Sequence, residues 1–197
     1  MSGEIDIYNV AAVAIDQEPL TSPDQQNKLG RLCRARYVAC RRFVLRGFPW
    51  NCARGRVQVG ADPTAPVFGY ANQYLLPADF LRVISVNNNL NANWRVEGLV
   101  NAAGVPIGQG LLTDEGAPLQ LIYIRDLVDV TRMDPMLVRA IGYDLGAEIA
   151  MAMTGEIAKR DRALTALAEV LAAAKGAAAQ ENSSDEWDVD IWLQNRL

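Results

Sequence analysis

Histidine is absent from this chain of 197 residues. Its absence excludes Ser-His-Asp and Cys-His catalysis, zinc sites built from cysteine and histidine, and pH switching by imidazole. Only three cysteines occur, Cys33, Cys40 and Cys52. Cys33 and Cys40 lie on one predicted helix, about 10 Å apart along its axis, which is too far for a disulfide bond. We expect all three thiols to pack in the core of a protein that folds in a cytoplasm.

Long apolar runs and phosphate-binding motifs are also missing. No stretch approaches the roughly 20 apolar residues that span a bilayer, and the first residues lack the features of a signal peptide, so we expect no membrane contact. The glycines in residues 104–110 do not have the spacing of a dinucleotide-binding loop. The acidic residues 185–190 lack the glycine and the later glutamate of a calcium loop. The sequence therefore predicts no cofactor and no metal.

Charge is distributed unevenly along the chain, whose net charge is −4. Residues 28–56 contain nine lysines or arginines and no acidic residue. Residues 181–197 reverse the sign, with five acidic residues and a single arginine, Arg196. Blocks of opposite charge favour contacts between unlike surfaces.

Capping motifs and helical periodicity predict four helices. A first short helix is expected over residues 5–15. Ser22, followed by Pro23 and an acidic residue, predicts the start of a second helix that runs to about Arg46. Asp134, followed by a proline, predicts a third helix that ends near Met153. A fourth, alanine-rich helix is expected over residues 156–180.

The second predicted helix is amphipathic. Its apolar positions share one face, and most of its cations share the opposite face. The apolar face consists of Leu29, Leu32, Cys33, Tyr37, Cys40, Phe43 and Val44. The basic face consists of Arg31, Arg34, Arg41, Arg42 and Arg46, together with Lys28. Three interpretations of the basic face stay open: a solvated surface, a contact with DNA phosphates, or a contact with an acidic neighbouring subunit.

Between the second and third helices the helical period disappears. Apolar, β-rich runs predict strands over residues 80–86, 93–96 and 119–127. The asparagine-rich residues 87–93 are typical of a hairpin tip, and the glycines of residues 102–110 indicate a mobile loop. The sequence thus predicts an α+β protein. About four helices form a bundle from residues 1–55 and 130–180, a small β subdomain (56–129) is inserted, and residues 181–197 form an extended C-terminal arm.

The order of several short motifs resembles the head-to-tail adaptor family of tailed phages, which includes the tail tubular protein A group. The strongest match joins an Arg-Leu-Cys segment at residue 31 to Pro49, Trp50 and Asn51. The other matching segments follow in the same order along the chain: residues 68–71, 74–79, 94–98, 112–115, 121–124, 154–155 and 192–196. One position departs from the family, because Cys52 stands where phenylalanine is usual. This departure puts the packing behind Trp50 in question.

The resemblance implies a structural adaptor rather than an enzyme. Relatives form a ring of about twelve subunits between the portal protein and a tail, stopper or nozzle protein, at the head-tail junction of the virion. The ring extends the channel through which DNA passes without sequence-specific binding. The C-terminal arm of relatives docks on the portal, with the apolar and aromatic side chains as anchors. The expected docking residues are Trp187, Ile191, Trp192, Leu193 and Arg196. Gene transfer agents carry such adaptors as well.

Two alternative functions stay open. A cell-wall hydrolase would use a pair of carboxylates, for example Asp114 and Glu115 or the acids of residues 126–129. A non-specific DNA-binding module would use the basic helix of residues 28–46. No helix-turn-helix or aromatic-basic motif accompanies that helix, so we do not expect recognition of a DNA sequence.

Overall fold

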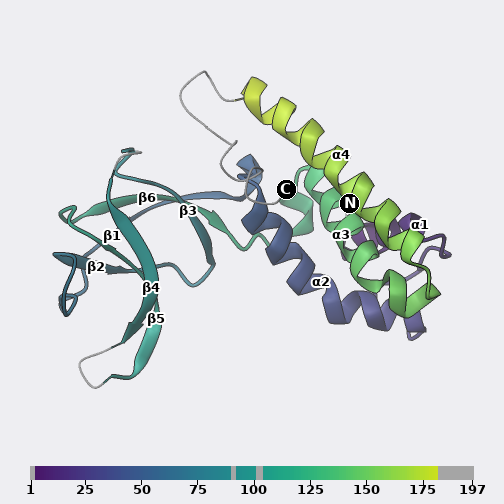
Figure 1. Cartoon of the computed structure of the whole chain (residues 1–197), viewed down its shortest axis with the longest axis horizontal. Coiled ribbons are helices and arrows are strands. Elements are labelled where there is room, and N and C mark those ends of the chain that lie inside the picture. The colour runs from purple at the N-terminus through teal and green to yellow at the C-terminus, as the bar shows by residue number, and fades with distance from the viewer. Residues whose placement is uncertain (1–2, 90–91, 101–103, 182–197) are drawn as a thin grey trace.

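The structure is a computed structural model that describes residues 3–89, 92–100 and 104–181. It is an α+β fold in which helices gather on one side and two small antiparallel sheets on the other (Figure 1). The predicted fold class is therefore confirmed. In chain order the helices and strands are α1 (Glu4–Ala14), α2 (Lys28–Gly47), β1 (Arg54–Val59), β2 (Asn72–Leu75), β3 (Phe80–Val86), β4 (Trp94–Val100), β5 (Pro106–Thr113), β6 (Leu119–Arg125), α3 (Pro135–Thr154) and α4 (Ile157–Glu181). Short 3-10 helices cover Asn51–Ala53 and Val130–Arg132.

Helix α3 is the centre of the helical part, because α1, α2 and α4 all pack against it. Asp134 caps its first turn by accepting a hydrogen bond from the Met136 backbone N–H at 2.7 Å. Gly155, with φ of 72°, ends the helix in the left-handed conformation that glycine tolerates best. Gly142 faces α1 so closely that a Cβ atom there would lie 2.5 Å from Val10 Cγ1. Small residues thus let α1 and α3 approach each other.

Helix α2 begins later than the sequence predicts. Its N-cap is Asn27, whose side chain accepts a hydrogen bond from the Gly30 N–H at 2.8 Å. Ser22 instead accepts from the N–H of Asp24 within a local turn. The prediction of a helix start at Ser22 was wrong because a serine hydroxyl can stabilise a turn as well as a helix, and the better-placed asparagine lies further on.

The six strands form two three-stranded sheets, ordered β1-β6-β3 and β2-β5-β4. Strands β3 and β6 match the predictions closely. Residues 87–93 were wrongly predicted as a hairpin tip, because β3 and β4 belong to different sheets and do not pair with each other. Residues 106–110 belong to β5 rather than to a loop. Gly110 is required there because the Leu99 side chain occupies the space where a Cβ atom would lie, at 2.1 Å.

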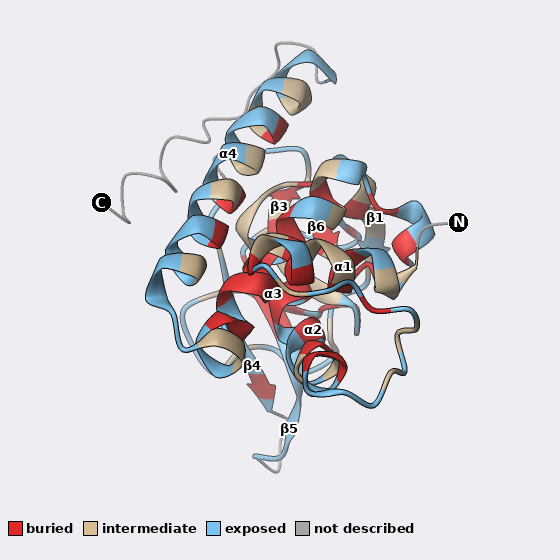
Figure 2. Cartoon of the chain, turned by 90° about the vertical axis from the view of Figure 1, so that its right-hand side faces the viewer, coloured by how far each residue is buried: buried red, intermediate tan, exposed pale blue. Residues whose placement is uncertain are grey.

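Two hydrophobic cores meet at β6. Figure 2 shows buried residues, in red, on α2, α3 and β3. Ile124 belongs to the core of the helical part, whereas Leu121 belongs to the core between the sheets. Trp50 is buried in the helical core, where its indole N–H donates to the Val44 carbonyl at 3.2 Å and its ring packs on Phe48. Cys52 packs against the same core, so its small side chain leaves Trp50 well enclosed.

Candidate interaction surfaces

The predicted basic face of α2 is not one uniform surface, because Arg41 is buried in the protein. Its Nε donates to Asp126 Oδ1 at 3.0 Å, and its guanidinium lies over the Tyr37 ring at 5.4 Å from the ring centroid. The placement of Arg41 on the basic face was therefore wrong. The opposite error concerns Phe43, which was assigned to the apolar face although its side chain is 47% exposed.

The remaining predicted arginines hold neighbouring segments in place. Arg34 is half-buried and donates to the carbonyls of Pro23 and Gln25, which fixes the turn before α2. Arg31 is exposed and donates to the Gln26 carbonyl at 2.9 Å. Arg42 is exposed, and its Nε donates to Asp126 Oδ2 at 2.7 Å, so that Arg41 and Arg42 share this carboxylate. The exposed Arg46 donates to the Leu81 carbonyl. The exposed members of the predicted face are thus Lys28, Arg31, Arg42 and Arg46.

The predicted docking residues Trp187, Ile191, Trp192, Leu193 and Arg196 lie outside the described residues. The structure does place the point from which that segment starts. Glu181, the last residue of α4, accepts a hydrogen bond from the Asn51 side chain at 2.7 Å. The end of α4 therefore lies close to the junction of α2 with β1.

The acidic residues considered for hydrolysis each hold backbone or side-chain groups in place. Asp114 accepts from the Ala71 N–H, and the Glu115 carboxylate accepts from the Asn87 side chain, both at 2.9 Å. Asp126 binds Arg41 and Arg42. Asp129 caps the 3-10 helix that begins at Val130 by accepting from the Thr131 N–H and hydroxyl. Each of these carboxylates has a structural role.

Exposed apolar side chains gather on the loop between β1 and β2, a feature that the sequence analysis missed. Val67 is 95% exposed and Phe68 is 86% exposed. The loop borders a hollow of about 500 Å³ over β4, lined by Arg95, Glu97 and Leu99 among others. The one signal in the sequence was an aromatic residue between Pro66 and Gly69, where turn chemistry keeps a side chain away from a core.

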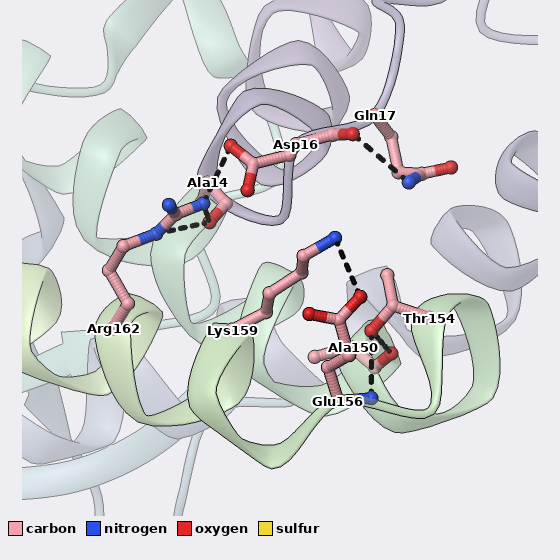
Figure 3. Close-up of polar contacts among 8 residues, drawn as sticks. All are labelled: Ala14, Asp16, Gln17, Ala150, Thr154, Glu156, Lys159 and Arg162. Atoms are coloured by element: carbon pink, nitrogen blue, oxygen red, sulfur yellow. Dashed lines mark hydrogen bonds and ion pairs between the residues drawn. The ribbon is translucent and has the colours of Figure 1, made fainter.

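A second hollow, of about 830 Å³, lies between α1, α3 and α4. Val10 and Val13 line it together with alanines of α4, and Arg139 and Arg162 stand at its edge. Figure 3 shows Arg162 reaching from α4 to Asp16 and to the Ala14 carbonyl at the end of α1, both at 2.8 Å. Its side-chain hydrogen bond lowers the pKa of Asp16. The residues that line the hollow include no serine, cysteine or lysine, and the hollow is open to solvent.

The three cysteines are free thiols, as the sequence predicts. Cys33 and Cys40 are buried, and burial raises the pKa of Cys33 to about 11. Burial also raises the pKa of Cys40, with a further contribution from the nearby Asp144. Among the described residues, no group of three or more candidate ligands could hold a metal ion. No described helix combines the length and the apolar character that crossing a membrane requires.

Three kinds of surface thus stand out in the part of the chain that the structure describes. They are the exposed arginines near the end of α2, the apolar loop at Val67 and Phe68, and the hollow beside α1. None of them has the enclosed polar groups of a typical enzyme site. No model of a protein family matches the chain, and no curated protein matches it in sequence.

Proposed function

We propose that this protein is a structural adaptor subunit that forms a ring between the portal and the tail of a phage-like particle. The observation that carries the proposal is the pair of almost fully exposed apolar side chains, Val67 and Phe68, on the loop between β1 and β2. Exposed apolar groups of this kind mark surfaces that bind other proteins. A subunit of a ring needs such a surface, since each copy covers its neighbour.

The order of the sequence motifs supports the more specific proposal that this ring subunit is similar to the adaptor family. Trp50 is buried between the end of α2 and the start of β1, and the matching segments at residues 74–79, 94–98 and 121–124 fall in or next to strands. The motifs are therefore distributed over both parts of the molecule. The structural roles of Asp114, Glu115 and Asp126 argue against the hydrolase alternative. The burial of Arg41 weakens the DNA-binding alternative.

Electron microscopy of the protein mixed with the portal protein from the same genome tests the proposal. We expect rings of about twelve subunits to form on the portal. The matched variants are Phe68→Ser, which removes an exposed apolar group, and Val128→Ser, which does so at a position outside the loop. Phe68→Ser should reduce ring formation, whereas Val128→Ser should not. Failure of the unmodified protein to decorate portal rings would contradict the proposed function.

A further inference from the structure

Strand β4 is an open edge of the β2-β5-β4 sheet, in the part of the molecule away from α1 and α4 (Figure 1). It pairs with β5 along one side. No described residue forms a backbone hydrogen bond with its other side. Because the N–H and C=O groups of a strand point alternately to its two sides, this edge offers unpaired donors and acceptors to a further strand.

The other three sheet edges are each protected. At β2, the Asp62 N–H donates to the Gln73 carbonyl at 2.8 Å, so another segment of the chain occupies part of that edge. Two register shifts interrupt the pairing of β3 with β6, and such irregularities hinder the addition of a strand. Strand β1 contains arginine but no acidic residue, so two copies of it would bring like charges together. Strand β4 is therefore the edge best suited to pair with a second copy of itself.

The charges of β4 are complementary to themselves. Arg95 and Glu97 are 67% and 47% exposed, and within one chain they lie 3.5 Å apart in a contact that contributes little to stability. If two copies of β4 lie antiparallel with their Val96 residues opposite each other, Arg95 of each copy lies opposite Glu97 of the other. Directly opposite side chains have Cβ atoms about 4.5–5.5 Å apart, which is close enough for an ion pair. This register thus creates two ion pairs between the copies.

The other face of β4 fits the same register. Trp94 and Val96 pack against the core between the sheets, and Trp94 of each copy would lie opposite Gly98 of the other. No atom lies within 4 Å of the place that a Cβ atom at Gly98 would take, so an indole ring has room to cover this glycine. Aromatic side chains stabilise edge glycines in this way. The irregularity of β4, between Leu99 and Val100, lies beyond the paired segment.

We propose that two copies of this chain associate through antiparallel β4 strands, so that their β2-β5-β4 sheets join into one continuous sheet. The register about Val96 suits either set of outward-pointing backbone groups, because an antiparallel pair can place its hydrogen bonds at the central residues or at their neighbours. The contact is isologous and closes after two copies. The proposal does not depend on the adaptor function, because it concerns the free protein and needs no portal.

Sedimentation velocity of the full-length protein over a series of concentrations measures this association. We expect an equilibrium between monomer and dimer in which high salt favours the monomer, because the ion pairs are exposed. Glu97→Arg and Arg95→Glu should each weaken the dimer about tenfold, since each places two pairs of like charges across the contact. The matched controls, Glu169→Arg and Arg160→Glu, change exposed residues of α4 and should leave the dimer unchanged.

A mixture of the two β4 variants protects the test against misfolding. In a mixed dimer both acids lie on one copy and both cations on the other, so the two cross-strand pairs are again opposite in charge. Mixing Arg95→Glu with Glu97→Arg should therefore restore dimers about as strong as those of the unmodified protein, which misfolded chains could not form.

Three results would overturn the proposal. The first is a monomer at every concentration, and the second is association that the charge reversals at Arg95 and Glu97 leave unchanged. The third is a mixture of the two β4 variants that stays monomeric. Growth beyond the dimer would count against it as well, because an isologous contact leaves no edge for a third copy. None of these results bears on whether rings form on a portal.

Discussion

Arg41 and Asp126 lie 85 positions apart in the sequence and form a buried ion pair that joins the helical part to the last strand. Their side chains are only 5% and 9% exposed, and two nitrogens of the guanidinium lie 3.0 Å from the same carboxylate oxygen. Arg42 approaches the second oxygen from the surface at 2.7 Å. The pair therefore fixes how α2 sits on β6, and with it how the helices meet the sheets.

Removing the carboxylate from this pair should destabilise the whole protein. We expect Asp126→Ala to lower the free energy of unfolding by about 3–5 kcal/mol, because Arg41 would be left as an uncompensated buried charge. Urea unfolding followed by circular dichroism measures the change. The control is Glu97→Ala, which removes the exposed partner of Arg95 and should cost less than about 1 kcal/mol. Similar losses for both variants would contradict the buried role of the pair.

Replacing two helical glycines by alanine should change the stability of the protein in opposite directions. Gly142→Ala would place a Cβ atom 2.5 Å from Val10 Cγ1, so α1 must shift. We expect a loss of about 1–3 kcal/mol from overpacking. Around Gly176 of α4, no atom lies within 4 Å of the place that a Cβ atom would take, so Gly176→Ala should stabilise by about 0.5–1 kcal/mol through helix propensity. Urea unfolding of both variants checks the prediction, and stabilisation by Gly142→Ala would contradict the close helix contact.

The ion pair in Figure 3 predicts a dependence of the Asp16 pKa on Arg162. The side-chain hydrogen bond from Arg162 lowers the pKa of Asp16 below its ordinary value. Any stabilisation from this pair is therefore complete above the ordinary pKa of aspartate, and it is lost as the pH falls through the lowered pKa. Arg162→Gln should raise the pKa of Asp16, measured by NMR titration of its carboxyl carbon. Arg139→Gln, at the same hollow, should leave it unchanged.

The cysteines should differ in their reactivity toward a thiol reagent such as Ellman's reagent. Cys33 and Cys40 are buried and their pKa values are raised, so few thiolates form and access is blocked. Burial raises the pKa of Cys52 as well, but its side chain is only half-buried and is therefore more accessible to the reagent. We expect modification of the folded protein at mildly alkaline pH to begin at Cys52, as located by mass spectrometry. Urea should then make all three thiols reactive, and fast labelling of Cys40 in the folded state would contradict its burial.

Local signals explain which parts of the fold could be predicted. The Asp134 cap and the left-handed Gly155 bound α3 by chemistry that is visible within a few residues. Strand β5 was missed because Gly108 and Gly110 look like loop residues, and only the tertiary contact with Leu75 and Leu99 explains them. The true start of α2 depended on a choice between two capping residues, Ser22 and Asn27, that sequence alone does not decide.

The candidate surfaces were harder to predict than the fold. A helical wheel assigns Arg41 to the polar face because it contains no information about Asp126, a partner more than 80 positions away. The same wheel finds Arg31, Arg42 and Arg46 correctly as exposed cations. The exposure of Val67 and Phe68 depends on the position of the loop between β1 and β2 in the folded protein, which a local sequence pattern does not give.

The position of α3 late in the chain sets the order in which the parts can fold during translation. Helices α1 and α2 leave the ribosome first, but the helix against which they pack follows only after all six strands have been synthesised. Strand β1 likewise cannot form its hydrogen bonds until β6 has been synthesised. The apolar faces of α1 and α2 therefore stay uncovered for most of the synthesis, and such faces attract chaperones and favour aggregation. A ribosome stalled before residue 135 would thus hold a chain whose N-terminal helices have no core to join.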